Sequence, residues 1–277
     1  MKNEGYSLNR KNITRLTVGF IVLLGMISLG YQSERKPDIS TTKPTVFLHG
    51  YKGTFNSFGF MLDRFEDKYN WGNRALIYYV SANGEISTRN LSKGRSEPPL
   101  VQVVFEDNRA GFTQSAAWFA SVLKHMKQHY YVENVNLVGH SMGGIVSLEF
   151  LKQYNDKELY PKVDKFVAIA SPFDGIYSEG YFQVNHGPAA TDLIPGSAAL
   201  EMLRERPFPE DISVLSIGST GDKVAVPESL KSLRQIIPKE QLEEIVIEDK
   251  SLGHSGLHEN QQVDQLIHSF LWKDRVQ

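Results

Sequence analysis

The sequence predicts an α/β fold in which helices cover both faces of a mostly parallel central sheet. Short apolar runs rich in β-branched residues alternate with helical patterns over most of the chain. Strands buried on both faces have continuous apolar runs rather than alternating ones, and they occur mainly in parallel sheets. We expect strands at Thr45–Leu48, Ala75–Val80, Val135–Val138, Phe166–Ala170, Val214–Gly218 and Glu244–Ile247.

The helices are indicated by apolar residues that recur every three or four positions. One such pattern runs from Ala116 to Met126, before the third expected strand, and another runs from Val263 to Phe270 near the C-terminus. Each would present one apolar face to the sheet.

Two segments interrupt this alternation. Residues Ser81–Pro99 are rich in Ser, Asn, Gly and Arg and are followed by the apolar run Leu100–Phe105, so we expect an inserted loop or hairpin there. Residues Pro172–Ala198 carry several glycines and prolines among aromatic residues. Such a composition is poor core material and predicts a lid-like insertion.

The composition excludes several classes of protein. Hydrophobic residues at 41% and charged residues at 22% are ordinary for a globular domain, and the net charge of −2 comes without a basic stripe. We therefore expect no nucleic-acid partner. Cysteine is absent, which excludes disulfides, thiolate metal sites and a cysteine nucleophile. Composition predicts no particular oligomeric state.

The N-terminal residues 1–33 resemble an export signal or membrane anchor. Four basic residues precede an uncharged, mostly apolar stretch, Leu16–Ser33. Its most apolar part, Leu16–Leu29, is short for a bilayer span, but counted through Tyr31 the stretch could cross if flanking residues reach the interface. No Ala-x-Ala site or lipobox cysteine follows it. We expect a single uncleaved anchor in the cell membrane, with a linker at 34–44 and the folded domain at 45–277 outside the cell. The alternative is a cleaved signal and a secreted protein.

The motif Gly139-His-Ser-Met-Gly143 lies directly between an apolar strand and a helical pattern. This G-x-S-x-G spacing predicts a sharp strand-to-helix turn that exposes a serine nucleophile, here Ser141. The flanking glycines let strand and helix approach without a clash of Cβ atoms. The helix that follows also favours negative charge near its N-terminus.

Three motifs in order carry a family resemblance: Phe47-Leu-His-Gly-Tyr-Lys-Gly, Val138-Gly-His-Ser-Met-Gly-Gly and Leu252-Gly-His-Ser-Gly-Leu. With them the chain resembles, from Pro44 to its C-terminus, the bacterial lipase and esterase branch of the α/β-hydrolase family. More narrowly, it is similar to the largely uncharacterised cell-surface hydrolases of Gram-positive bacteria. The resemblance implies an α/β-hydrolase fold and a triad of serine, acid and histidine in that chain order.

The same resemblance implies an oxyanion hole made of backbone N–H groups. One would come from Met142, after the nucleophile, and the other from Tyr51, in the loop that His49-Gly50 opens. Gly50 would let this loop approach the substrate carbonyl. For the His49 side chain we expect a buried structural role.

Two histidines compete for the role of general base. His254 follows the last expected strand closely, where similar lipases carry the base, whereas His258 lies nearer the final helix beside Glu259. We favour His254. The spacing of the two also suggests a metal site, but the sequence does not match H-E-x-x-H and offers no third ligand, so we expect no metal.

Two aspartates compete for the role of the acid. Asp222 follows the strand Val214–Gly218, and Asp174 follows the preceding strand. We favour Asp222 as the carboxylate that orients the histidine. Either aspartate could instead cap a turn.

These residues predict acyl transfer to water through an acyl-enzyme, without a cofactor. The expected substrates are small-molecule or lipid-like carboxylic esters, because aromatic and aliphatic side chains of the lid-like segment, including Phe173, Ile176 and Tyr181, suit an acyl chain. The alternatives are an amidase, peptidase or acyltransferase with the same triad, since the fold does not determine the acyl acceptor. A protein of another class, a non-catalytic cell-surface binding module, is a further alternative.

Overall fold

The computed structural model describes residues 39–40, 43–93, 98–154 and 158–273. The predicted signal or anchor at 1–33 lies outside these residues. In the part that is described, no helix has the length and apolar character needed to cross a membrane.

The described residues form an eight-stranded sheet with the strand order β3-β2-β4-β1-β5-β6-β7-β8. All neighbouring strands run parallel except β2 and β3, which form an antiparallel pair. The strands are β1 (Thr45–Leu48), β2 (Asn73–Val80), β3 (Ile86–Asn90), β4 (Pro99–Phe105), β5 (Asn134–His140), β6 (Lys162–Ile169), β7 (Ser213–Ser219) and β8 (Leu242–Ile247). The predicted α/β class and the six predicted strands are confirmed, with ends that differ by a few residues.

The sequence interpretation of the segment after β2 predicted the hairpin but missed one strand. A hairpin does follow β2, because β3 pairs with it antiparallel. The run Leu100–Phe105, however, belongs to β4, which lies inside the sheet between β2 and β1 and is buried along its whole length. A short apolar run after a polar loop looks the same in either position, since only its neighbours distinguish a central strand from a hairpin arm.

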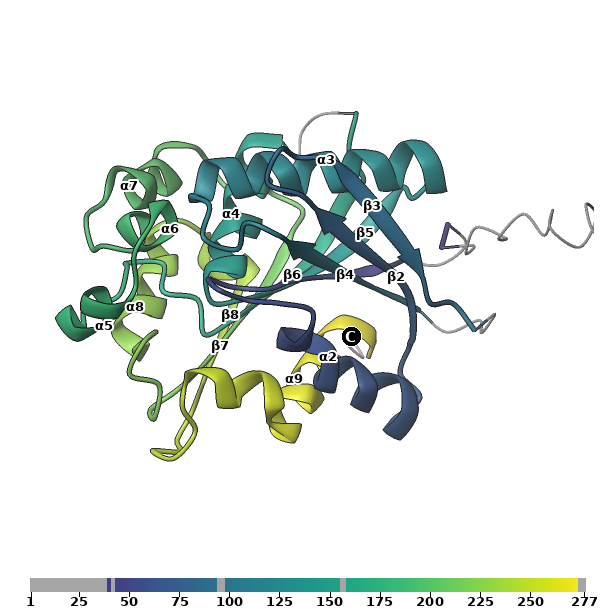
Figure 1. Cartoon of the computed structure of the whole chain (residues 1–277). Coiled ribbons are helices and arrows are strands. Elements are labelled where there is room, and N and C mark those ends of the chain that lie inside the picture. Colours follow the sequence, from purple (N-terminus) through teal and green to yellow (C-terminus); the bar gives the residue numbers. More distant parts are fainter. Residues whose placement is uncertain (1–38, 41–42, 94–97, 155–157, 274–277) are drawn as a thin grey trace, which may run out of the picture. The chain divides into compact units, whose positions relative to one another are not determined.

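Helices cover both faces of the sheet (Figure 1). Helices α3 (Phe112–Tyr130) and α4 (Met142–Tyr154) lie on one face, and α2 (Asn56–Asp63) and α9 (Gln261–Trp272) lie on the other. Both patterns predicted as helices are confirmed as α3 and α9. Asn260 begins α9 by accepting hydrogen bonds from the backbone N–H groups of Gln262 and Val263, a normal N-cap.

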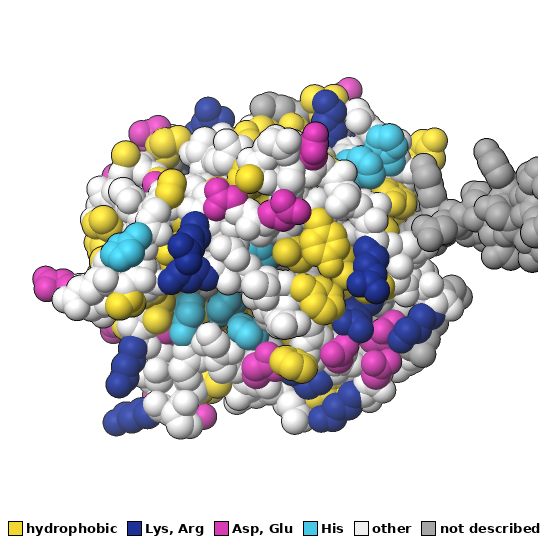
Figure 2. Space-filling view, in the orientation of Figure 1, with side chains coloured by type: hydrophobic (Ala, Val, Ile, Leu, Met, Phe, Trp, Pro, Cys, Tyr) yellow, Lys and Arg dark blue, Asp and Glu magenta, His cyan; other side chains and the backbone are white. Residues whose placement is uncertain are grey.

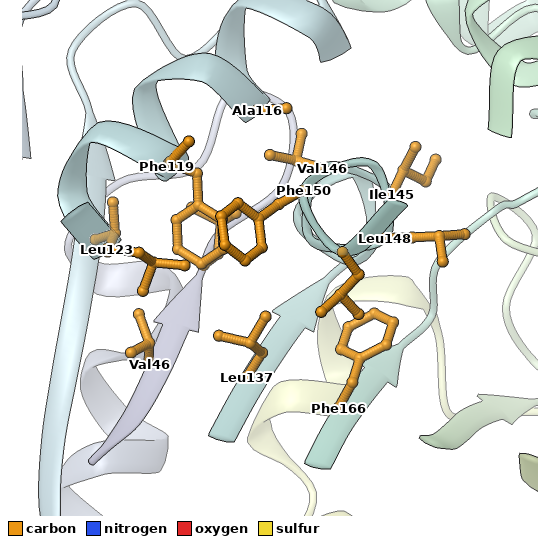
Figure 3. Close-up of a cluster of buried hydrophobic side chains, with 14 of the residues drawn as sticks. Val46, Ala116, Phe119, Leu123, Leu137, Ile145, Val146, Leu148, Phe150 and Phe166 are labelled. Atoms are coloured by element: carbon orange, nitrogen blue, oxygen red, sulfur yellow. The ribbon is translucent and has the colours of Figure 1, made fainter. Parts of the chain in front are cut away.

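Each face of the sheet has its own hydrophobic core. Figure 3 shows the core under α3 and α4, where Phe119 and Phe150 from the two helices pack in an edge-to-face contact above Leu137 of β5. The second core lies between the sheet and the layer of α2 and α9. Ile39, within the predicted linker, is also buried in the first core. Two-sided burial explains why the strands are apolar without alternation.

The predicted lid-like segment contains α5 (Glu179–Val184) and α6 (Pro188–Asp192) and is followed by α7 (Ala198–Glu205). Phe173 and Ile176 do not line a lid: both are fully buried in the first core. Tyr181 and Phe182 of α5 are only half-buried. Shorter elements complete the described chain: η1 (Arg64–Lys68), α8 (Pro227–Lys231), η2 (Ser232–Gln235), η3 (Lys239–Gln241) and η4 (His254–Glu259).

Candidate active site

The predicted nucleophile lies on the turn between β5 and α4. Ser141 has a φ of 55°, a left-handed conformation that is unfavourable for a residue with a Cβ atom. Its N–H donates to the carbonyl of Ile169 on β6 (2.8 Å), which holds the turn against the neighbouring strand. Ser141 retains 6% of its possible exposure. The surrounding structure therefore maintains a strained turn, as is common at functional sites.

Glycine is required on both sides of this serine. A Cβ atom on Gly139 would lie 2.5 Å from the nitrogen of Gly144, and one on Gly143 would overlap the carbonyl oxygen of Leu48 on β1. Both obstacles are backbone atoms, which cannot move aside. The G-x-S-x-G spacing thus follows from the close approach of strand and helix.

His254 and Asp222 lie beside Ser141 in a continuous hydrogen-bonded chain. The His254 Nε2 atom is 2.9 Å from Ser141 Oγ, and its Nδ1 atom is 2.8 Å from Asp222 Oδ2. A carboxylate only accepts hydrogen bonds, so Nδ1 carries the proton and Nε2 is free to accept the serine O–H. The Asp222 side chain is fully buried, and its other oxygen accepts the N–H groups of Val224 (2.8 Å) and Ala225 (3.0 Å).

The two competing residues have other partners. Asp174 accepts hydrogen bonds from the Tyr177 hydroxyl and from Arg204, both at 2.6 Å. His258 Nδ1 lies 3.2 Å from Glu259 Oε1, and burial lowers the pKa of this histidine. Only His254 and Asp222 of the four candidates are joined to Ser141 by these hydrogen bonds. In Figure 2, histidine side chains (cyan) gather left of the centre of the molecule, to the left of the position at which Figure 1 labels α2.

The loop after β1, residues 49–53, meets the turn of Ser141 and is here termed the oxyanion loop after the role that the sequence predicts for it. A Cβ atom on Gly50 would lie 2.7 Å from the Ser141 Cβ atom and 3.3 Å from the Met142 nitrogen. The Tyr51 N–H has no acceptor in the described part of the chain, and the Met142 N–H, as the first of α4, has none within its helix. Two backbone donors next to a nucleophile are suited to binding an oxyanion.

His49 supports this loop from within. Its Nδ1–H donates to the Gly50 carbonyl (2.8 Å), and its Nε2 accepts the N–H of Phe105 on β4 (3.0 Å). Burial lowers the pKa of His49, which favours the neutral ring that these two bonds require. With one nitrogen donating and the other accepting, the ring has no free position for proton transfer.

Residues 178–187, here termed the strap, are bonded to the oxyanion loop. The Tyr51 hydroxyl donates to the carbonyl of His186 (2.7 Å) and accepts its N–H (3.1 Å). Lys52 Nζ donates to the side-chain oxygen of Asn185 (2.7 Å). The oxyanion loop therefore contacts both the strap and the nucleophile turn.

Two residues near the site had not been identified from the sequence. His140 precedes the nucleophile, and its Nε2 lies 3.2 Å from the carbonyl oxygen of His254. Arg64, in η1, donates to the carbonyl of His258 (3.0 Å) and pairs with Glu259 and Asp264. His140 could have been identified as a site residue from the sequence, because it lies inside the G-x-S-x-G motif. Nothing in the sequence around Arg64 links it to a turn about 190 residues away, because the pairing depends on the fold.

No group of three or more His, Asp or Glu side chains suited to a metal ion occurs within the described residues.

Comparison with known proteins gives a family and a fold. The model of a family described as "Alpha/beta hydrolase of unknown function (DUF915)" matches residues 32–274. No curated protein matches the sequence.

Among solved structures, the lin2722 gene product of Listeria innocua is 22% identical, with a TM-score of 0.72 over 85% of this chain and 96% of that one. A protein of Lactobacillus plantarum WCFS1 is also 22% identical, with a TM-score of 0.67 over 85% and 94%. The α/β hydrolase MGS-MChE2, from the metagenome of lagoon sediments of Mar Chica, is 21% identical, with a TM-score of 0.50 over 83% and 91%. At these identities the similarity shows a shared fold.

Proposed function

Because the chain belongs to the DUF915 family of α/β hydrolases, we propose that it is a serine hydrolase that cleaves carboxylic esters, with Ser141 as nucleophile, His254 as general base and Asp222 as the orienting acid. The observation that carries the proposal is the chain of two hydrogen bonds, 2.9 Å and 2.8 Å long, that joins these three side chains. Their order is serine, base and buried carboxylate, which is the arrangement needed to activate a hydroxyl.

The reaction follows from this geometry in two half-reactions. Ser141 Oγ attacks the ester carbonyl while its proton passes to His254 Nε2, and the N–H groups of Tyr51 and Met142 bind the resulting oxyanion. Collapse of the tetrahedral intermediate breaks the C–O bond, and the alcohol leaves with the proton from His254. Water then attacks the acyl-enzyme with the same base, which releases the carboxylic acid and restores Ser141.

The ester class is supported by the side chains next to the oxyanion loop. The rings of Tyr51 and Tyr181 lie 6.3 Å apart, and Phe182 packs beside Tyr181 at 5.2 Å. These half-buried rings would offer apolar surface to an acyl chain.

The test uses the full-length chain and a fluorophosphonate probe, followed by hydrolysis of p-nitrophenyl esters of increasing chain length, the matching anilides, and acyl acceptors other than water. Labelling of Ser141 and ester turnover, both absent in Ser141→Ala, would support the proposal. Faster cleavage of anilides would indicate an amidase, and net transfer to an acceptor would indicate an acyltransferase. Folded protein that is neither labelled nor active would favour a binding module.

We also propose that residues 1–33 anchor the chain in the cell membrane with the hydrolase domain outside. The support is in the sequence: four basic residues precede Leu16–Ser33, and Glu34 follows soon after, which by the positive-inside rule retains the N-terminus in the cytoplasm. Cells would be fractionated and treated with external protease. Chain that is soluble and protected in intact cells would refute the proposal, and chain found only in the medium with a new N-terminus would replace the anchor by a cleaved signal.

A further inference from the structure

His140 is a buried histidine beside the nucleophile that the proposed reaction does not use. It is the last residue of β5 and is 6% exposed. Its Nε2 lies 3.2 Å from the carbonyl oxygen of His254. The centre of its ring is 4.9 Å from that of His254 and 4.7 Å from that of His258.

The protonation of His140 follows from its surroundings. A carbonyl oxygen can only accept, so the Nε2 atom of His140 must carry a hydrogen. Burial lowers the pKa of His140 well below its ordinary value, and the neighbouring rings of His254 and His258 lower the pKa further. His140 is therefore a neutral donor to the main chain of His254, and it adds no positive charge beside the base.

The turn that carries the base is held at both ends by side chains from elsewhere in the fold. His254 is the first residue of η4, and His140 binds its carbonyl. At the other end, Arg64 donates to the carbonyl of His258 (3.0 Å) and to the carboxylate of Glu259 (3.1 Å). Arg64 is itself held by two hydrogen bonds, of 2.6 Å and 2.9 Å, to the buried carboxylate of Asp264.

We propose that His140 is a positioning residue for the general base: its main chain carries Ser141, while its side chain holds the main chain of His254. One residue would thus define the distance between the proposed nucleophile and its base. The inference rests on the proposed function. A displacement of about 1 Å at a catalytic group lowers a rate by up to about 10²-fold, so the loss of this hydrogen bond should be measurable.

Two variants with an uncharged amide at position 140 distinguish the effect of this hydrogen bond from the effects of side-chain polarity and packing. In His140→Gln the amide nitrogen can reach the place of the imidazole Nε2 and donate to the His254 carbonyl. In His140→Asn the amide nitrogen reaches only as far as Nδ1, so the donor is lost. His140→Ala removes the side chain, and His129→Ala, at an exposed histidine of α3, is the matched control.

Each variant is measured by kcat and KM for a p-nitrophenyl ester, by the rate of fluorophosphonate labelling, and by the downfield proton resonance of the His254–Asp222 hydrogen bond. We expect His140→Gln to keep kcat within about 3-fold of wild type, and His140→Asn and His140→Ala to lower it by about 10- to 100-fold with little change in KM. The downfield resonance should persist in His140→Gln and be broadened by exchange in the other two. His129→Ala should match wild type.

Equal activity of the Gln and Asn variants, or a Gln variant as impaired as the Ala variant, would overturn the proposal, because the donor would then not matter. If His140→Ala does not fold, the comparison of Gln with Asn decides alone. If the wild-type chain is neither active nor labelled, the proposed function fails. The resonance still tests the positioning, since it requires no turnover.

Discussion

Replacement of Asp222 by asparagine should strongly lower kcat by reversing the tautomer of His254. In the native site Oδ1 of Asp222 accepts two backbone N–H groups, from Val224 (2.8 Å) and Ala225 (3.0 Å), and Oδ2 accepts the Nδ1–H of His254 (2.8 Å). An asparagine has a single amide oxygen, and two backbone donors will hold it at the Oδ1 position. Its NH₂ group then faces Nδ1, which has to accept, so the ring hydrogen moves to Nε2 and the ring can no longer take the proton of Ser141.

The magnitude follows from these contacts. The reversed amide would direct its NH₂ group at two buried N–H groups, and each buried donor left unpaired costs about 1–3 kcal/mol. At 1.4 kcal/mol for each factor of ten, the reversed orientation is populated at roughly a few per cent or less. The wrong tautomer at a serine triad lowers kcat by about 10⁴-fold. The reversed orientation restores the correct tautomer, so its population limits the loss: we expect kcat to fall by between about 30-fold and this value for Asp222→Asn.

The assay is kcat on a p-nitrophenyl ester together with the rate of fluorophosphonate labelling, with thermal unfolding to establish that the variant is folded. Asp174→Asn is the matched control. Its side chain is 37% exposed and pairs with Arg204, so we expect kcat within about 3-fold of wild type because a surface ion pair contributes little. A folded Asp222→Asn variant within tenfold of wild type, or a larger loss for Asp174→Asn, would refute this account of the acid.

Three further predictions concern the base, the oxyanion loop and the strap. His254→Ala should lower kcat by about 10³-fold or more, and His258→Ala by no more than about tenfold, in parallel ester assays; the reverse ranking would make His258 the base. Gly50→Ala should lower kcat by about 10²-fold and also lower thermal stability, because its Cβ atom would lie 2.7 Å from the Ser141 Cβ atom and 2.9 Å from the backbone oxygen of His140 and would displace the oxyanion loop. Unchanged kcat in the folded variant would separate this loop from catalysis. Tyr51→Phe removes the two hydrogen bonds to His186 and should raise hydrogen exchange of the strap amides by about tenfold or more, measured by mass spectrometry; unchanged exchange would mean that other contacts hold the strap.

The features that the sequence predicted well depend on local chain geometry. The turn around Ser141 needs a strand, a helix and glycines at fixed positions, and all three are visible in one short window. The expected strands were found because burial on both faces leaves continuous apolar runs. The position of β4 was missed because a strand's neighbours are not encoded next to it in the chain.

The choice between rival residues depended on the order of the strands. Asp174 and Asp222 both follow parallel strands, and both could have faced the base. In the structure Asp222, after β7, reaches His254, whereas Asp174, after β6, pairs with Arg204. His254 and His258 lie in the same turn, and only the way this turn packs against β5 determines which ring meets Ser141.

By itself the sequence determined the α/β class, the nucleophile turn and a short set of candidates for each partner, because helical and strand periodicity and turn glycines are local properties of the chain. The tertiary structure alone decided which candidates meet, that Phe173 and Ile176 are core residues, and that His140 and Arg64 bind carbonyl groups of the turn at 254–259. These are contacts between segments up to 194 residues apart in the chain. Such contacts exist only once the strands have assembled in their final order.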